Sequence, residues 1–359
     1  MKRLISTTAA LFVAAAAHAA PYCGDLVNKD ALPKKYAKSA PFYSDDASGW
    51  IFTQDQLKDR YDMKASSQAM VAAIVEEFAK RDVQLAIIVP PPRPIVAGQA
   101  TLDAAMGAER YDIAAAKASF DKLIEGLAAT GATVPNLADV ALMSDDTRDA
   151  FYFQRDTHWT TTGSAMSAIR LSEMVNAQTP DAFQADGAYW FGDLVAADAI
   201  EEKGSLAKVV RDVCGLSIEN ETAQAYDLAR ASAGGLLGDA AAGPSIALVG
   251  SSFSNRYQRD HYRFGEALAW AFDADVENYS VSGGGPIGAI EAYVLSGALD
   301  RREHAMVVWE IPYTESFNSS SFLRQLLGAL RLPQVGGPTA PSKRRTKDEE
   351  LKRWGYGIS

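Results

Sequence analysis

The sequence predicts an α/β fold in which a central, mainly parallel sheet carries helices on both faces. Three observations predict it: short apolar runs rich in β-branched residues, longer segments with helical apolar spacing between them, and connections of crossover length. Strands are expected at residues 49–52, 83–89, 132–137, 151–153, 246–249, 276–281 and 306–311. Helices are expected at residues 63–80, 113–127, 162–175, 264–272, 287–295 and 321–330.

In the first half of the chain, strand and helix patterns alternate. Residues 49–52 are aromatic and apolar, as in a strand, and the segment 63–80 has apolar residues four apart, as in a helix. The strand at 83–89 ends at residues 90–94, a proline-rich segment that cannot donate ladder hydrogen bonds and therefore predicts a loop. The helix at 162–175 begins near a threonine cap.

The second half of the chain begins with a weakly patterned region at residues 181–243. From residue 246 onward, strands and helices alternate three times. Because the carboxyl ends of parallel strands meet at one edge of the sheet, the ligand site is expected at that edge.

Residues 1–19 predict a signal peptide, because two basic residues precede an alanine-rich apolar run and small residues stand before a cleavage site after Ala19. The protein is therefore expected to be exported to the periplasm. One globular domain is expected at 20–330 and a mobile tail at 331–359. An uncleaved membrane anchor is the alternative for the first segment.

The cysteines and the charge balance narrow the function. Cys23 and Cys214 are the two cysteines of the chain, and an even number in an oxidising compartment predicts a disulfide; free buried thiols are the alternative. The net charge of −10 makes nucleic acid an unsuitable partner, because nucleic acid requires a basic face. A polyanionic acceptor stays open if the chain presents a local basic strip.

The segment from residue 245 to 255 carries the candidate nucleophile. Its apolar run breaks at Gly250 into small hydroxyl residues, which places Ser252 on the turn where a buried strand ends. Gly250 permits the tight turn, and the backbone amide of Ser252 and its neighbours can face a developing oxyanion. The alternative is that Ser252 only caps a helix.

A serine nucleophile needs a base, which is usually histidine at neutral pH. His158 follows the strand at 151–153, at the edge where the serine is expected, and Asp156 can orient its imidazole. The other histidines lie at the opposite edge, too far along the chain, or in the leader: His304, His261 and His18. The alternatives are a turn role for Asp156 and a packing role for His158. A metal site is not expected, because no second His or Cys stands at ligand spacing.

Further candidates lie at the same edge. The backbone amide of Gly284, in the glycine-rich segment 282–286, can supply a second oxyanion donor, and a plain loop is an equal alternative. Glu310 ends the last predicted strand and is either a substrate-side polar group or a structural anchor. Candidates for stacking on a sugar, with core packing as the alternative, are Trp159, Trp309 and Tyr313.

These residues carry a family resemblance. Residues 250–254, Gly-Ser-Ser-Phe-Ser, resemble the nucleophile block of SGNH-type acyl hydrolases, with Ser251 where many of them have Asp. The upstream Asp-x-His-Trp block, residues 156–159, resembles the AlgX/AlgJ group of alginate O-acetyltransferases, in which Asp and His precede Ser in a circularly permuted order. The resemblance extends from residue 41 to residue 329 and includes the segments 49–52 and 309–312.

The resemblance implies an SGNH-like three-layer fold with Ser252 as nucleophile, His158 as base and Asp156 as its orienter. It implies no cofactor, an exopolysaccharide acceptor, an acetyl donor delivered by a membrane acyltransferase, and polymer-export proteins as partners. The AlgX branch carries a carbohydrate-binding module after the catalytic domain, and this chain is expected to lack one. The acceptor must then be held by the cleft or by a partner, with Arg256 as the candidate contact for a uronate carboxylate.

The predicted function is therefore that of a periplasmic polysaccharide O-acetyltransferase working by double displacement. His158 deprotonates Ser252, an acetyl-serine forms, and His158 then activates a sugar hydroxyl. A carbohydrate acetylesterase with the same triad, in which water replaces the sugar, is the first alternative. A non-catalytic, glycan-binding member of an export complex is the second. The polymer and the acetyl donor are left open by the sequence.

Overall fold

The computed structural model describes residues 21–107, 110–180, 182–183, 191–228, 244–256, 262–285 and 287–332. The predicted signal peptide, His18, His261 and the predicted tail from residue 333 onward lie outside the described residues, so the predictions that concern them stay predictions, as do the domain boundaries. Within the described ranges, no helix combines the length and the apolar composition needed to cross a membrane.

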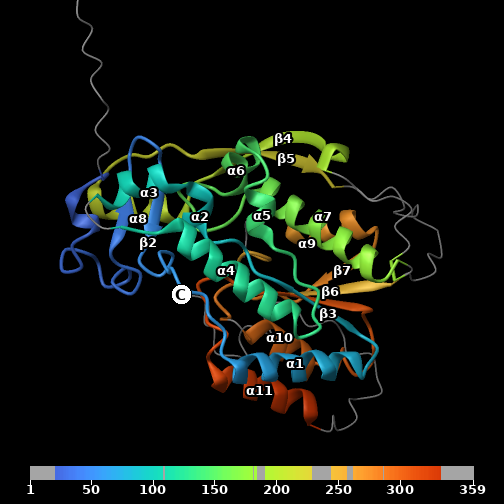
Figure 1. The fold of residues 1–359 in the computed structure, drawn as a ribbon. Helices are drawn as coiled ribbons and strands as arrows, with labels where there is room; N and C mark the ends of the chain where they lie inside the picture. Colours follow the sequence, from blue (N-terminus) through green and yellow to red (C-terminus); the bar gives the residue numbers. More distant parts are fainter. Residues whose placement is uncertain are drawn as a thin grey trace, which may run out of the picture.

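A four-stranded parallel sheet forms the centre of the molecule (Figure 1). Its strand order is β3 (Gln84–Ile88), β8 (Met306–Glu310), β6 (Ser245–Val249) and β7 (Asp275–Asn278). Each neighbouring pair is parallel, so all four carboxyl ends lie at one edge. The inner strands β8 and β6 and the outer strand β3 are buried along almost their whole length, as expected for a sheet that is covered on both faces.

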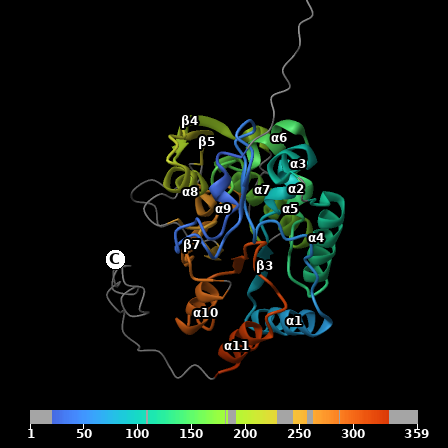
Figure 2. The ribbon, with the colours of Figure 1, turned by 90° about the vertical axis from the view of Figure 1, so that its left-hand side faces the viewer.

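Helices cover both faces of this sheet (Figures 1 and 2). One face carries α1 (Ala65–Ala79), α10 (Gly288–Leu295) and α11 (Ser320–Arg331). The other carries α4 (Ile113–Ala128), α7 (Thr161–Gln178) and α9 (Phe264–Phe272), with α5 (Leu137–Ala141) and α6 (Asp145–Phe151) packed on α7. The predicted three-layer α/β fold is confirmed.

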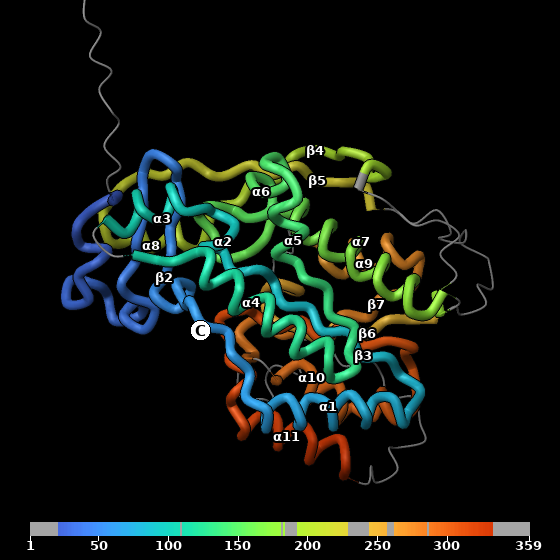
Figure 3. Tube along the Cα trace, viewed as in Figure 1, coloured from blue at the N-terminus to red at the C-terminus, as the bar shows by residue number. Residues whose placement is uncertain are grey.

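The N-terminal segment lies beyond the carboxyl edge of the sheet, on the left of Figure 3. It contains η1 (Gly24–Leu26) and the antiparallel pair β1 (Phe42–Ser44) and β2 (Ile51–Thr53), and it packs against α8 (Ser205–Cys214). These elements share a small apolar core of their own, made of Leu26, Leu32, Ala40, Phe42, Ile51, Leu206, Val209 and Val210. The disulfide predicted between Cys23 and Cys214 is present and joins the N-terminal segment covalently to the end of α8.

Two expected strands are single β-bridges. In the segment 132–137, only Thr133 pairs with β3, through Ala86, and the chain then enters α5. In the segment 151–153, Phe151 ends α6 and Tyr152 makes one antiparallel bridge. A short apolar run has the same appearance in a strand and in a buried connection, which is why both predictions were wrong.

The expected loop at 90–94 is also shorter than predicted, because Arg93 begins α2 (Arg93–Ala97) and Pro94 lies in its first turn. The first turn of a helix tolerates proline, since its N–H groups have no partner within the helix. A further short helix, α3 (Gln99–Met106), follows at once.

The weakly patterned region at 181–243 contains regular structure that the sequence did not indicate. An antiparallel pair, β4 (Val195–Glu202) and β5 (Glu221–Asp227), lies along α7, and α8 lies between these strands in sequence. Seven of the eight β4 residues are exposed or partly exposed, so the strand has no apolar alternation to reveal it.

Arg93 is a fully buried cation that ties the edge of the sheet to the N-terminal segment. Its guanidinium donates to Ile51 O at 2.7 Å and to Gln56 Oε1 at 2.9 Å. It also donates to Phe153 O at 2.9 Å and to Gln154 O at 2.7 Å. One side chain thus joins three stretches of chain at the carboxyl edge.

We predict that Arg93→Ala lowers the free energy of unfolding by at least about 3 kcal/mol, because three buried oxygens and one partly buried oxygen lose their donors and the side chain leaves a cavity. Arg148→Ala, at a partly exposed position of α6, serves as the control and should cost less than about 1 kcal/mol. Urea denaturation measures both. A loss below 1 kcal/mol for Arg93→Ala would show that this guanidinium does not hold the segments together.

Candidate active site

Ser252 lies on the turn that follows β6, at the carboxyl edge of the sheet, and is partly buried. Gly250 opens the turn. A Cβ atom there would lie 2.6 Å from Glu310 Oε2 and 2.7 Å from Ser254 Oγ, so only glycine fits. The Ser254 N–H donates to Ser251 O and closes the turn. The sequence therefore placed this serine on the correct edge and on the correct kind of turn.

Asp156, His158 and Ser252 form one hydrogen-bonded chain. The Nε2 atom of His158 lies 2.8 Å from Ser252 Oγ, and its Nδ1 atom lies 2.5 Å from Asp156 Oδ1. The same carboxylate oxygen accepts the backbone N–H of His158 at 3.0 Å, which fixes the acid and the base against each other. Asp156 has no exposed surface and His158 is 6% exposed, so little water reaches the chain. A carboxylate, an imidazole and a serine hydroxyl in this order suit acyl transfer.

The loop that carries the acid and the base is fixed at both ends. Tyr152 and Trp159 form an antiparallel bridge across it. The Thr160 hydroxyl caps α7 by accepting the Gly163 N–H. A Cβ atom at Gly163 would lie 2.3 Å from Phe151 O, so glycine allows α7 to start directly against the end of α6. The loop therefore has little freedom to move the imidazole away from the serine.

Three further groups hold the Asp156 carboxylate. Its Oδ2 atom accepts the backbone N–H of Ser205 at 2.6 Å and the Arg256 guanidinium at 3.1 Å, and the Tyr262 hydroxyl lies 3.3 Å from Oδ1. Burial alone would raise the pKa of Asp156. The facing His158, the Arg256 charge and the Ser205 N–H outweigh burial and hold this pKa well below its usual range. Asp156 is thus an anion at neutral pH.

Tyr262 and Ser205 were missed by sequence reasoning. The Tyr262 ring stacks on the His158 ring, with centroids 4.8 Å apart and planes inclined by 21°, and its hydroxyl lies 3.2 Å from Nδ1. Ser205 contributes a backbone N–H, which leaves no signal in the sequence. Tyr262 lies ten residues after Ser252 and outside any motif, so only the fold brings it to the imidazole.

The Arg256 guanidinium is bonded by groups of the protein itself. Its Nη1 atom lies 3.1 Å from Asp156 Oδ2, 3.4 Å from Glu202 Oε1 and 2.5 Å from the Tyr262 hydroxyl. Two fully buried carboxylates therefore already neutralise the guanidinium. Arg256 therefore supports the acid of the site, and its contact with a uronate carboxylate stays a prediction.

Glu310 is the structural anchor of the nucleophile turn and not a substrate-side group. Its buried carboxylate accepts the Ser251 N–H at 2.7 Å, the Ser251 hydroxyl at 2.9 Å and the Ser254 hydroxyl at 3.0 Å. Burial raises the pKa of Glu310 to about 7, and these hydrogen bonds limit the rise. The contacts also account for the serine at position 251, because an Asp there would place a second carboxylate against Glu310.

The predicted stacking of Trp159 and Trp309 on a sugar is wrong, because the two side chains are 0% and 1% exposed. The Trp159 indole donates to Phe253 O at 3.0 Å and packs against the Phe253 and Phe264 rings. Tyr313 is also buried, at 2% exposed, so it offers no face for stacking.

The second oxyanion donor predicted at Gly284 is also wrong for this conformation, since the Gly284 N–H donates to Val281 O at 3.0 Å. The segment nevertheless lies at the predicted place, because the Val281 N–H donates to Gly250 O at 3.0 Å. The glycine-rich segment is thus a turn that supports the nucleophile turn from the side.

A small pocket of about 120 Å³ adjoins the hydrogen-bonded chain. Its lining consists of Ser39, Thr53, Asp55, Gln56, Thr157, Phe253, Tyr313 and Thr314. Thr157 and Phe253 are the chain neighbours of the base and of the serine, and the Phe253 ring lies 4.9 Å from the His158 ring. Hydroxyl groups dominate this lining.

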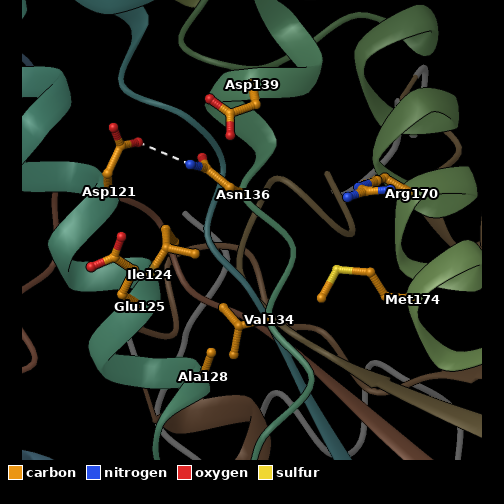
Figure 4. Close-up of a pocket in the computed structure, with 9 residues that line it drawn as sticks. All are labelled: Asp121, Ile124, Glu125, Ala128, Val134, Asn136, Asp139, Arg170 and Met174. Atoms are coloured by element: carbon orange, nitrogen blue, oxygen red, sulfur yellow. Dashed lines mark hydrogen bonds between the residues drawn. The ribbon is translucent and has the colours of Figure 1, made fainter. Parts of the chain in front are cut away.

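A larger pocket of about 390 Å³ lies elsewhere, between α4, α7 and the segment around α5 (Figure 4). Neither the serine, the base nor the acid lines it. Two of its carboxylates, Asp121 and Asp139, are paired with Lys117. Asn136 donates to Asp121, and Arg170 pairs with Glu173. Most polar groups of this pocket thus already have partners in the protein, and we assign it no part in the site.

A three-layer α/β fold, with a serine on the turn after a central parallel strand and a His-Asp pair supplied from upstream in the chain, defines the class of SGNH hydrolase-like proteins. The family model described as "SGNH hydrolase-like domain, acetyltransferase AlgX" matches residues 46–313. The chain belongs to this family, and the resemblance inferred from the sequence is confirmed.

Named relatives and solved structures agree with this assignment. The chain is 25% identical over 288 residues to the alginate biosynthesis protein AlgX of Pseudomonas putida, covering 78% of this chain and 58% of the relative. It is 25% identical over 323 residues to AlgX of Azotobacter vinelandii, covering 86% and 63%. The chain thus spans less than two thirds of the length of these curated relatives.

Two solved structures share the fold. Pseudomonas aeruginosa AlgX superposes with a TM-score of 0.68 at 23% identity, covering 89% of this chain and 74% of that one. The O-acetyltransferase domain of Pseudomonas putida AlgJ superposes with a TM-score of 0.54 at 21% identity, covering 78% and 96%.

The raised pKa of Glu310 gives a prediction for stability. The folded protein binds this proton more tightly than the unfolded chain does, so the free energy of unfolding should fall as pH rises from about 4.5 to about 7. The contribution is of the order of 3 kcal/mol. Glu310→Gln removes this titration, so its free energy of unfolding should fall by about 3 kcal/mol less than that of the wild type over this pH range.

Urea denaturation at pH 4.5 and pH 7.5 measures the slope. Glu266→Gln, at an exposed position of α9, is the control and should leave the slope unchanged, because that side chain is hydrated in both states. Equal slopes for wild type and Glu310→Gln would contradict the assignment.

Proposed function

We propose that this protein transfers an acetyl group, through an acetyl-serine intermediate, to a polysaccharide hydroxyl. The observation that carries the proposal is the continuous hydrogen-bonded chain from Asp156 through His158 to Ser252. Membership of an acetyltransferase family supports acetyl as the group transferred. An exopolysaccharide suits the acceptor role, because the similar proteins are named for alginate biosynthesis.

In the first half of the reaction, His158 Nε2 takes the proton of Ser252 Oγ as this oxygen attacks the carbonyl carbon of the acetyl donor. The imidazolium that forms is stabilised by the Asp156 anion. The backbone N–H of Ser252, at the head of its turn, is the proposed oxyanion donor. When the tetrahedral intermediate collapses, His158 returns the proton to the leaving group and the acetyl ester of Ser252 remains.

In the second half, His158 Nε2 takes the proton of a sugar hydroxyl, whose oxygen attacks the acetyl-serine carbonyl. Collapse of this second intermediate releases the acetylated sugar, and His158 returns the proton to Ser252 Oγ. Atoms and charges balance without a cofactor. Both halves use the same base and the same oxyanion donor, so one site suffices.

The pocket beside the triad is the proposed position of the acceptor sugar. Its hydroxyl, amide and carboxylate groups can exchange hydrogen bonds with sugar hydroxyls, and its volume suits one ring or part of one. Tyr313 lines this pocket, but its buried ring does not stack on the sugar. Asp55 gives the pocket a negative side, which favours binding through hydroxyls.

We place the reaction in the periplasm. The Cys23–Cys214 disulfide suits an oxidising compartment, and the leader-like residues 1–19 support export. A membrane acyltransferase that delivers the acetyl donor and the proteins of a polymer-export complex are the proposed partners.

Two alternatives use the same residues. In a carbohydrate acetylesterase, water replaces the sugar in the second half of the reaction. In a non-catalytic glycan-binding protein, no acetyl-serine forms. The alternatives differ in their products, so product analysis separates them.

We predict that Ser252→Ala and His158→Ala each lower turnover of an activated acetyl ester by at least about 10³-fold, and Asp156→Asn by about 10²-fold, because the three groups act as a unit. Steady-state hydrolysis measures this. Ser66→Ala, at an exposed position of α1, is the matched control. Unimpaired turnover by Ser252→Ala would contradict the proposed mechanism.

We also predict that an acceptor oligosaccharide diverts the acetyl group from water. Water is present at about 55 M, so transfer requires a sugar hydroxyl held at the ester, a proximity effect worth several kcal/mol. Mass spectrometry should find acetylated oligomer, with a matching fall in released acetate. Acetate as the sole product with every acceptor, including in the presence of the export proteins, would assign the protein as an esterase.

A further inference from the structure

The first turn of α8 is built around the catalytic loop. The Ser205 N–H donates to Asp156 Oδ2 at 2.6 Å, and the Leu206 and Ala207 N–H groups both donate to Arg155 O at 3.0 Å. The first amides of a helix have no partner within the helix. Here three of them are all directed at two consecutive residues, one of which is the acid of the triad. The positive end of the helix dipole therefore faces the Asp156 charge.

The residues that precede α8 are shaped for this approach. Gly204 has φ of +71°, and a Cβ atom there would lie 2.3 Å from Arg155 O. The Gly204 N–H donates to Glu202 Oε1 at 2.9 Å, and the same carboxylate oxygen lies 3.4 Å from Arg256 Nη1. Since Arg256 also binds Asp156, the end of β4 and the start of α8 hold the acid from two directions. Several separate contacts thus hold the start of α8 against Asp156.

The other end of α8 is fixed by the disulfide. Cys214 is the last residue of the helix and is bonded to Cys23. The apolar side of the helix packs on the separate small core of the N-terminal segment, through Leu206, Val209 and Val210. Ten helical residues span about 15 Å. One helix therefore connects the covalent tie at Cys214 with the Ser205 N–H that binds the acid of the triad.

We propose that α8 and the Cys23–Cys214 disulfide form one positioning unit for the triad, which sets the place and the charge of Asp156. The proposal rests on the proposed acyl transfer for its kinetic readout only. It assigns the disulfide a part in turnover in addition to its part in stability. Ser205 acts through Asp156, so it is a positioning residue.

Ser205→Pro is the sharpest variant. Proline is favoured at the first position of a helix, so α8 can persist, but the N–H that binds Asp156 is lost and a ring carbon displaces Oδ2. We expect kcat for an activated acetyl ester to fall at least about tenfold with KM changed less than twofold. The acid limb of the pH profile should move to higher pH, because a less neutralised Asp156 favours the imidazolium.

The matched control is Ser320→Pro, at the first position of α11, on the face of the sheet that carries α1 and α10. It places the same substitution at the same helical position and should keep the wild-type kcat and pH profile. Ser205→Ala keeps the N–H and should lose no more than about twofold in kcat.

A second variant tests the covalent end. Cys23→Ala/Cys214→Ala should lower kcat and move the acid limb in the same direction as Ser205→Pro, at a temperature where near-ultraviolet circular dichroism shows it folded. If it does not fold, Ser205→Pro still decides the proposal.

A readout independent of turnover is the downfield proton resonance of His158 Nδ1–H, identified by its loss in His158→Gln. It should change its chemical shift or broaden in Ser205→Pro and in the cysteine variant, because the carboxylate that accepts this proton loses a donor or its fixed position. A folded Ser205→Pro protein with the wild-type resonance, kcat and pH profile would overturn the proposal. Wild-type protein with the resonance but without turnover would instead count against the proposed function.

Discussion

The buried anion of Asp156 is the constraint around which the site is assembled. An ionised carboxylate without exposed surface is very costly unless charges and hydrogen bonds surround it. Its partners come from separate parts of the chain: the imidazole of its own loop, the first amide of α8, a guanidinium after β6 and the Tyr262 hydroxyl. Each of these elements must be in place before the charge is tolerated. The same contacts therefore stabilise the fold at this edge and orient the base.

Two buried carboxylates support the site, Asp156 through the base and Glu310 through the nucleophile turn, and they have opposite environments. Asp156 is paired with cationic or potentially cationic groups, so its pKa is held low despite burial. Glu310 receives only neutral donors, from Ser251 and Ser254, and burial raises its pKa to about 7. The first is suited to stabilising an imidazolium and the second to fixing a turn. The sheet thus holds the nucleophile turn through Glu310 of β8, while the start of α8, Arg256 and Tyr262 hold the acid.

The sequence predicted those parts that depend on local pattern and on the rules of parallel sheets. The strand before Gly250, the turn at Ser252 and the Asp-x-His loop all followed from periodicity and from the shared carboxyl edge. It did not predict β4, because an exposed strand has no apolar alternation, and it also missed α8, which lies in the same region of the chain. It offered Trp159 and Trp309 as substrate contacts, since the burial of a single side chain is set by contacts distant in sequence and leaves no local pattern. Every residue type except proline has a backbone N–H, so no sequence motif could reveal the role of the Ser205 N–H.

The central claim is that Ser252 becomes acetylated, and intact-protein mass spectrometry after brief exposure to an activated acetyl ester tests it most directly. The account predicts a mass gain of one acetyl group, mapped by peptide analysis to Ser252, and loss of that gain when an acceptor oligosaccharide is added. Folded protein that gains no acetyl group, or gains it at a residue other than Ser252, would contradict the account.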